Sequence, residues 1–196
     1  MKWLLLVGFA YLLGSVPCGV VVARLLGQDD PRGAGSGNIG ATNVARTVGR
    51  TAGVATLLGD VCKGLIPTAW AGASFASPWA VAGVGLAAYL GHLFPLYLGF
   101  KGGKGVATGL GVFLGIAPGT ALLAAAVFGG VAWKGRLVSL ASLCAAGALP
   151  LLLAFFGAPL AHVALGLAVG GLSMWKHGGN IERLLEGTEN RLGRAA

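Results

Sequence analysis

Residues 35–46 gather the side chains best suited to chemistry in an otherwise apolar sequence, reading Gly35-Ser36-Gly37-Asn38-Ile39-Gly40-Ala41-Thr42-Asn43-Val44-Ala45-Arg46. The closely spaced glycines let backbone N–H groups turn toward a ligand. The segment ends at Arg46, whose planar guanidinium group can form two parallel hydrogen bonds to a phosphate. The segment therefore predicts a site for an anionic oxygen, the alternative being a plain glycine-rich connecting loop. The candidate ligand-binding residues are Ser36, Gly37, Asn38, Thr42 and Asn43, with Arg46 as the cation.

A second segment, residues 91–108, places two lysines around a Gly-Gly turn at the start of a predicted helix. Exposed amides, the positive end of a helix dipole and two ammonium groups would then converge on one anion. The spacing is not that of a P-loop, because no Ser or Thr follows the lysine. The alternative is that both lysines only follow the positive-inside rule. The candidate substrate-binding residues here are His92, Lys101, Gly102, Gly103 and Lys104.

A third polar segment, residues 176–190, follows the last apolar run and contains His177, Asn180 and Glu189. Ser139 and Ser142 begin a predicted helix on the same side of the membrane and would add hydroxyl groups to substrate binding. A functional role is one interpretation of His177, and the alternative is that it is a side chain at the membrane interface with no role in function. The tail after Gly178 is predicted to form a short amphipathic helix over residues 181–186.

Asp60 and Lys63 lie three residues apart inside a predicted membrane helix, on one face of it. Charges within the membrane are costly, so a pairing or functional role is expected. We interpret the two as a structural ion pair beneath the site, with direct substrate contact as the alternative.

The composition identifies the class of protein. Hydrophobic residues make up 56% of the chain and charged residues only 10%, which is typical of an integral membrane protein. The net charge of +8 does not indicate nucleic-acid binding, because the basic residues are spread singly between apolar runs. Three cysteines without paired spacing predict neither a disulfide framework nor a metal site.

The distribution of cations predicts the topology. Lys2 stands alone before the first apolar run, which we interpret as one retained helix over residues 3–23 because it is longer than a signal-peptide core. Clusters of cations follow along the chain, separated by apolar segments. If all the clusters are cytoplasmic, the chain between two successive clusters crosses the membrane an even number of times. We therefore expect an all-α integral membrane protein with seven transmembrane helices in a single domain, 1–196. The N-terminus is outside, the C-terminus cytoplasmic, and two short spans lie in the middle, over residues 105–133. The clusters comprise Arg24, Arg32, Arg46 and Arg50; Lys101 and Lys104; Lys134 and Arg136; and Lys176, Arg183, Arg191 and Arg194.

The three polar segments together resemble the cytoplasmic motifs of the bacterial PlsY family of acyl-phosphate:glycerol-3-phosphate acyltransferases. The resemblance extends over nearly the whole chain, including Gly59-Asp60 and Lys63-Gly64. The third segment departs from the family by having Gly178-Gly179 after the histidine. Membership implies the first step of phospholipid synthesis: acyl transfer from acyl phosphate to the 1-hydroxyl of glycerol-3-phosphate, giving lysophosphatidic acid and phosphate.

The resemblance also implies roles for individual residues. The family's active-site serine and arginine fall on Ser36 and Arg46, its glycerol-3-phosphate-binding glycines and lysine on the 102–104 turn, and its third-segment asparagine and glutamate on Asn180 and Glu189. It further implies no cofactor, a bacterial inner-membrane location with membrane lipids as surroundings, and an active site facing the cytoplasm. A substrate phosphate oxygen would serve as base, with His177 as the second choice.

Two other functions are alternatives to the enzyme, a transporter and a structural subunit. A transporter for phosphorylated anions would place its polar groups near the bilayer midplane on broken helices in two related halves. Here the polar groups gather at one predicted surface, and only Asp60 and Lys63 lie deep. A structural subunit of a lipid-synthesis complex would leave three separate anion-binding segments unexplained.

Overall fold

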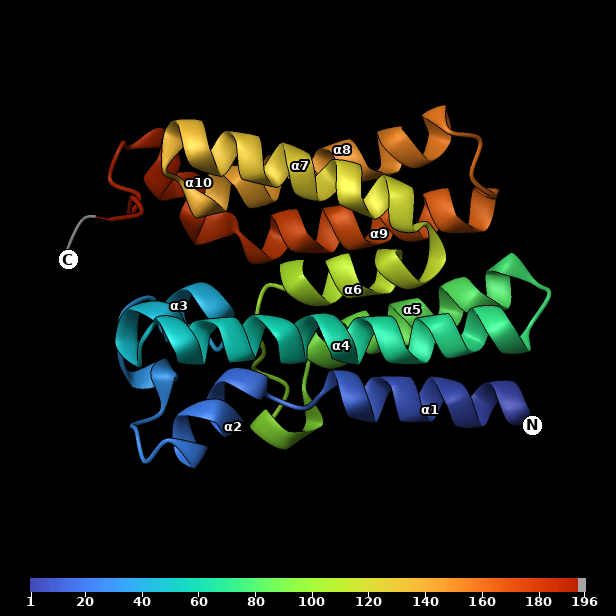
Figure 1. Ribbon diagram of the computed structural model, residues 1–196, viewed down its shortest axis with the longest axis horizontal. Helices are drawn as coiled ribbons and strands as arrows, with labels where there is room; N and C mark the ends of the chain where they lie inside the picture. The colour runs from blue at the N-terminus through green and yellow to red at the C-terminus, as the bar shows by residue number, and fades with distance from the viewer. Residues whose placement is uncertain (194–196) are drawn as a thin grey trace. The chain divides into compact units, whose positions relative to one another are not determined.

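The computed structural model describes residues 1–193, and all the regular secondary structure in that range is helical, with no strand (Figure 1). Arg194, counted above among the cytoplasmic cations, lies outside the described residues. The chain divides into two compact units, the first ending at Ile116 and the second beginning at Ala117. The first unit contains α1 (Lys2–Gly14), α2 (Cys18–Leu25), η1 (Pro31–Gly33), α3 (Ala41–Thr47), α4 (Arg50–Ser74), α5 (Pro78–Leu93), η2 (Leu96–Leu98) and α6 (Val106–Ile116). The second contains α7 (Pro118–Gly135), α8 (Val138–Phe155), α9 (Leu160–Lys176) and α10 (Gly178–Leu185).

In the first unit α4 is the central helix, and α1, α5 and α6 pack along it (Figure 1). Glycine makes the tightest of these contacts possible. A Cβ on Gly111 would overlap the carbonyl of Val61, and a Cβ on Gly64 would overlap that of Thr108. Small residues of this kind let membrane helices approach closely where no hydrophobic effect draws them together. The close approach of α4 and α6 brings the helix carrying Asp60 and Lys63 against the one that follows the second polar segment.

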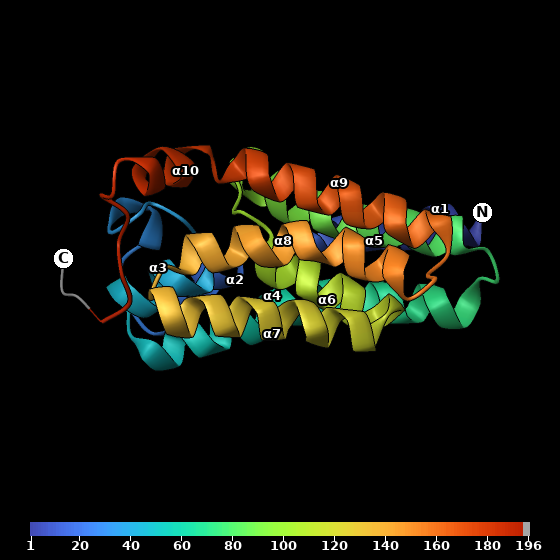
Figure 2. The ribbon, with the colours of Figure 1, turned by 90° about the horizontal axis from the view of Figure 1, so that it is seen from above.

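In the second unit α7, α8 and α9 run side by side, and α10 turns off the end of α9 (Figure 2). Proline and glycine in the sequence predict helix breaks at residues 76–78, 118–119 and 156–159, and the structure confirms all three. Pro78 and Pro118 occupy the first position of α5 and α7, which proline tolerates well, and Pro159 is the N-cap of α9. The tail helix, predicted over 181–186, begins three residues earlier, at Gly178.

The prediction of one continuous helix over residues 3–23 was wrong. The structure breaks it into α1 and α2, which are bent by 49° relative to each other. Pro17 has no N–H to continue the hydrogen-bond ladder and disfavours the helical conformation at Val16, so the chain leaves the helix at Ser15. The carbonyl of Val16 is thereby released for another partner, which is described below.

Among the described residues, two helical segments meet the length and apolarity expected of a membrane crossing, 78–98 and Val138–Phe155, and the bent pair α1–α2 would make a third. The remaining predicted spans have helices, but shorter or more polar ones. The helix α6, with 11 residues, extends only about 16 Å, against about 30 Å for the hydrocarbon core. Of the two middle spans predicted to be short, α6 is the shorter, while α7 has 18 residues.

Candidate active site

The loop before α3 is organised by the amide of Asn43, whose side chain is buried. Its Nδ2 donates to the carbonyls of Pro31, Ala34 and Asn38 at 2.8, 3.1 and 2.9 Å, and its Oδ1 accepts the Ser36 N–H at 2.8 Å. The sequence predicted that Asn43 would bind substrate. The structure instead engages both of its polar atoms with the backbone of its own loop.

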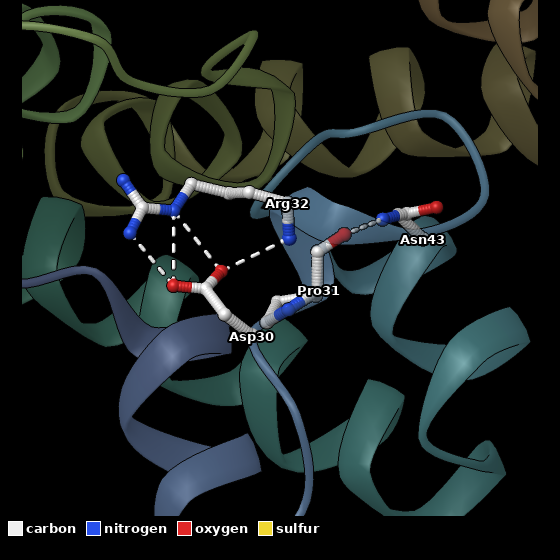
Figure 3. Close-up of polar contacts among 4 residues, drawn as sticks. All are labelled: Asp30, Pro31, Arg32 and Asn43. Carbon is white, nitrogen blue, oxygen red and sulfur yellow. Dashed lines mark hydrogen bonds and ion pairs between the residues drawn. The ribbon is translucent and has the colours of Figure 1, made fainter.

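An ion pair stabilises the entry to the same loop (Figure 3). The Asp30 carboxylate caps the turn at Pro31 by accepting the Arg32 N–H at 3.0 Å, and it holds the Arg32 guanidinium at 2.7 Å. The hydrogen bond between the two side chains lowers the pKa of the Asp30 carboxyl and raises that of the Arg32 guanidinium. From the sequence alone, Arg32 was expected only to be one of the cytoplasmic cations that set the topology. The sequence Asp30-Pro31 does indicate a helical turn capped by Asp30, since Asp is favoured at a helix N-cap and Pro at the first position after it.

The remaining candidate side chains of this segment are open to ligands. Ser36, Thr42 and Arg46 are exposed, and their side chains form no hydrogen bond or ion pair with any residue of the described chain. Asn38 is half-buried, and its Oδ1 accepts the Gly40 N–H at 3.2 Å. The backbone is left-handed at Gly35 and Gly37, with φ of +62° and +68°. The segment therefore presents the Ser36 hydroxyl from a loop whose shape is held by Asn43, and the Arg46 guanidinium from the last turn of α3.

A buried polar cluster connects α4, α5 and α6. Asp60 and Lys63 are 2% and 3% exposed, and their Oδ1 and Nζ atoms lie 2.8 Å apart. Lys63 also donates to the Val16 carbonyl at 2.8 Å, the group released by the break between α1 and α2. His92 Nδ1 lies 3.7 Å from Asp60 Oδ1 and 3.1 Å from the Thr108 hydroxyl. The cluster therefore includes both predicted ion-pair residues and, in addition, His92.

His92 in turn shapes the glycine turn of the second segment. Its carbonyl accepts the Gly103 N–H at 3.2 Å, and its ring occupies the space that a Cβ on Gly103 would need. A Cβ on Gly102 would overlap the same carbonyl. Because the His92 ring is 3% exposed, its contacts indicate that it holds the turn, whereas the sequence predicted substrate binding.

The lysines of this segment lie on either side of the glycine pair. Lys101 is exposed, and Lys104 is half-buried. The Lys104 carbonyl accepts the Tyr89 hydroxyl at 3.4 Å, and the backbone then turns through Gly105, with φ of +80°, into α6. The buried cluster and Tyr89 thus fix the chain before and after the position from which Lys104 extends.

In the second unit the third segment folds back on itself. Asn180 Nδ2 donates to Glu189 Oε1 at 2.8 Å, and Arg183 Nε donates to Glu189 Oε2 at 2.9 Å. The predicted pair Asn180 and Glu189 is therefore in direct contact. Arg183 was missed as part of this group, although its position three residues after Asn180 on the tail helix puts both on one face.

His177 ends α9 and is 3% exposed. Its Nδ1 lies 2.7 Å from the Ser173 carbonyl, and because a carbonyl only accepts, the proton of the neutral ring is on Nδ1. The Nε2 atom is then the basic nitrogen.

Ser139 and Ser142 lie buried in the first turns of α8. The Ser142 hydroxyl donates to Val138 O at 2.8 Å, while Ser139 Oγ has no hydrogen-bond partner among the described residues.

The chain matches known proteins over almost all of its length. Residues 4–187 match the family model described as glycerol-3-phosphate acyltransferase. The chain is 53% identical over 189 residues to the glycerol-3-phosphate acyltransferase of Geobacter sulfurreducens, covering 96% of each chain, and 49% identical to that of Syntrophotalea carbinolica, covering 93% of each.

Two solved structures share its fold. Both are crystal structures of PlsY, described as an integral membrane glycerol 3-phosphate acyltransferase, one in the glycerol 3-phosphate form and one in the lysophosphatidic acid form. Their TM-scores against this chain are 0.95 and 0.93, with 45% identity over 98% of this chain and 96% of theirs.

Proposed function

Because the chain belongs to the glycerol-3-phosphate acyltransferase family, as its three polar segments predicted, we propose that it transfers a fatty acyl group from acyl phosphate to the 1-hydroxyl of glycerol-3-phosphate. The products are lysophosphatidic acid and phosphate. The observation that carries the proposal is the similarity to PlsY in its glycerol 3-phosphate and lysophosphatidic acid forms over nearly the full chain. The family model extends across both compact units, which supports treating residues 1–196 as one acyltransferase domain.

In the proposed reaction the glycerol hydroxyl oxygen forms an ester bond to the acyl carbonyl carbon, and the bond from that carbon to the phosphate oxygen breaks. The hydroxyl proton passes to a phosphate oxygen of the substrate. Acyl phosphate is already activated, so the protein's main tasks are positioning, worth about 7–11 kcal/mol when the geometry is right, and stabilisation of developing charge.

The first unit supplies the groups for these tasks. Ser36 and neighbouring backbone amides are positioned by Asn43 and stabilise the oxyanion that develops on the carbonyl. The Arg46 fork and the Lys104 ammonium bind phosphate, Arg46 that of the leaving group and Lys104 that of glycerol-3-phosphate. The remaining residues proposed to bind the two substrates are Gly37, Asn38, Thr42, Lys101 and the turn at 102–104.

Within the second unit the candidate residues are Asn180, held by Glu189, and His177, with Ser139 and Ser142 as further hydroxyl groups. His177 remains the second candidate for the base because its Nε2 is the nitrogen without the proton in the neutral ring. No cofactor is required by this chemistry, since the acyl phosphate brings its own leaving group.

For the membrane arrangement we propose seven crossings, with the N-terminus outside and the C-terminus in the cytoplasm. The positive-inside rule supports this arrangement, and it puts the three polar segments at the cytoplasmic face of the inner membrane. Membrane-impermeant thiol labelling of single cysteines at Ser36, Lys104 and Asn180, in a background without Cys18, Cys62 and Cys144, tests it. Labelling of any of the three from outside intact cells contradicts the proposal.

The direct test of function uses the purified protein with palmitoyl phosphate and glycerol-3-phosphate. We expect lysophosphatidic acid and phosphate in equal amounts, and no product when palmitoyl-CoA replaces palmitoyl phosphate. Turnover with the thioester at a comparable rate would reject the proposed donor and leave the acceptor unchanged.

A further inference from the structure

We propose that Asn43 is a positioning residue for the acyl transfer: it makes no contact with substrate and acts by holding Ser36 and the 31–38 loop in the reactive arrangement. The inference rests on the proposed function, because it assigns Asn43 a part in that reaction. It differs from the substrate-binding role that the sequence alone predicted for this residue.

The loop between η1 and α3 has few hydrogen bonds of its own. Between Gly33 and Asn38 its backbone bonds are local turns, such as that from the Gly37 N–H to the Ala34 carbonyl at 3.1 Å. The Asn43 amide spans this segment, because its Nδ2 reaches carbonyls near the start, middle and end of it, at Pro31, Ala34 and Asn38. One side chain therefore replaces the regular ladder that a helix or strand would supply.

The fourth bond links this support to the reactive residue. Asn43 Oδ1 accepts the Ser36 N–H, which fixes the backbone of Ser36 while its hydroxyl stays exposed. With a side chain 2% exposed and both polar atoms bonded to the loop, Asn43 is oriented inward, away from any ligand on the open side. Figure 3 shows the amide meeting the Pro31 carbonyl beside the Asp30–Arg32 pair, a second support at the same end of the loop.

The environment requires asparagine itself. An aspartate at this position would face the three carbonyls with two acceptor oxygens, so none of the three hydrogen bonds donated by Nδ2 could form. A longer glutamine side chain lacks space, because Asn43 Oδ1 already lies where a Cβ on Gly35 would be. Gly35 is also left-handed, with φ of +62°, so an alanine there both strains the backbone and displaces the amide.

The experiment measures kcat, KM for glycerol-3-phosphate and backbone hydrogen exchange of residues 31–40 in Asn43→Ala, Asn43→Asp and Gly35→Ala. If positioning is the role, each variant loses about 10²-fold in kcat, the effect of misplacing a reacting group by about 1 Å. Exchange across residues 31–40 rises, while KM changes little. In the Asn43→Ala/Ser36→Ala double variant the losses are not additive, because both act through the same group.

Two matched variants serve as controls. Gly33→Ala adds a methyl group with nothing within 4 Å in the same loop, and Thr47→Val removes the 3.0 Å hydrogen bond to the Asn43 carbonyl while leaving its amide bonds intact. Both are expected to keep wild-type kcat and exchange. Gly35→Ala keeps the amide itself, so it tests the idea if the Asn43 variants do not fold.

The inference is overturned if the Asn43→Ala and Ser36→Ala losses multiply, if the Asn43 and Gly35 variants raise KM in place of lowering kcat, or if kcat falls without faster exchange. It is also overturned if Asn43→Ala and Gly35→Ala keep wild-type turnover. Failure of the proposed function is distinguishable, because the wild-type protein itself would then make no lysophosphatidic acid.

Discussion

Lys63 donates a 2.8 Å hydrogen bond from its ammonium group to the Val16 carbonyl, at the point where the first helix breaks. The same ammonium lies 2.8 Å from the Asp60 carboxylate, and both side chains are almost fully buried. One cation therefore satisfies a carboxylate from its own helix and a backbone carbonyl that the proline kink has removed from helical bonding. The kink between α1 and α2 and the ion pair on α4 stabilise each other.

Replacing Lys63 with methionine should destabilise the protein by about 3–5 kcal/mol, because the Asp60 charge is left buried without its partner. Thermal unfolding in detergent measures the loss. The double variant Lys63→Met/Asp60→Asn should recover part of it, since no uncompensated charge then remains. A double variant less stable than either single variant would mean that the two residues do not act as a pair.

Gly103→Ala should lower the unfolding free energy by about 1–3 kcal/mol, the usual cost of forcing extra atoms into a packed site. The added methyl group would meet the His92 ring, which the Asp60 carboxylate and Thr108 hydroxyl hold in place. Gly119→Ala is the control, because nothing lies within 4 Å of its new methyl group. Combining Gly103→Ala with His92→Ala should cost less than the two changes added together, and strict additivity would show that the ring does not set the turn.

Arg46→Lys should lower kcat/KM by about 10- to 100-fold while leaving stability unchanged. A lysine ammonium keeps the charge but loses the bidentate fork, and a hydrogen bond to a charged group contributes about 1.5–3 kcal/mol. Arg50→Lys, an exposed change at the start of α4, is the control for a general effect of replacing a guanidinium with an ammonium group. Near-normal turnover by Arg46→Lys would remove Arg46 from the phosphate site.

Lys104→Ala should raise the KM for glycerol-3-phosphate by about tenfold or more, with a smaller effect on kcat, because it removes one charged contact to the acceptor phosphate. Lys134→Ala, at an exposed position near the end of α7, controls for the surface charge of the protein. The steady-state KM for each substrate separates the two roles. An unchanged KM for glycerol-3-phosphate together with a raised KM for acyl phosphate would assign Lys104 to the donor.

His177→Gln should lower kcat by less than about tenfold if a substrate phosphate takes the proton. Loss of a positioned general base costs about 10²- to 10⁴-fold, so the two mechanisms predict different ranges. Single-turnover rates at saturating concentrations of both substrates, with binding measured separately, isolate the chemical step. Abolished chemistry with both substrates still bound would make His177 the base and reject the substrate-assisted mechanism.

The amino-acid sequence by itself determined the class, the family and the positions of the three polar segments. Proline and glycine in the apolar runs indicate where several helices begin and end, because proline lacks an N–H and disfavours the helical conformation at the residue before it. Pro67 and Pro150 are exceptions that lie inside α4 and α8. The breaks at Pro78, Pro118 and Pro159 followed from this local rule. Proline also breaks the helix at Pro17. The long apolar run around this residue predicted a continuous helix there, and that prediction was wrong.

Only the tertiary structure decided which polar groups are open to a ligand and which support the fold. Asn43 was predicted to bind substrate and Ser36 to be catalytic, yet Asn43 is enclosed by its own loop, and Ser36 is exposed. His92 likewise joined the Asp60–Lys63 pair, from which it is separated by about thirty residues. Hydrogen-bonding capacity is a property of the residue type, but its use depends on which partners the folded chain brings within about 3 Å.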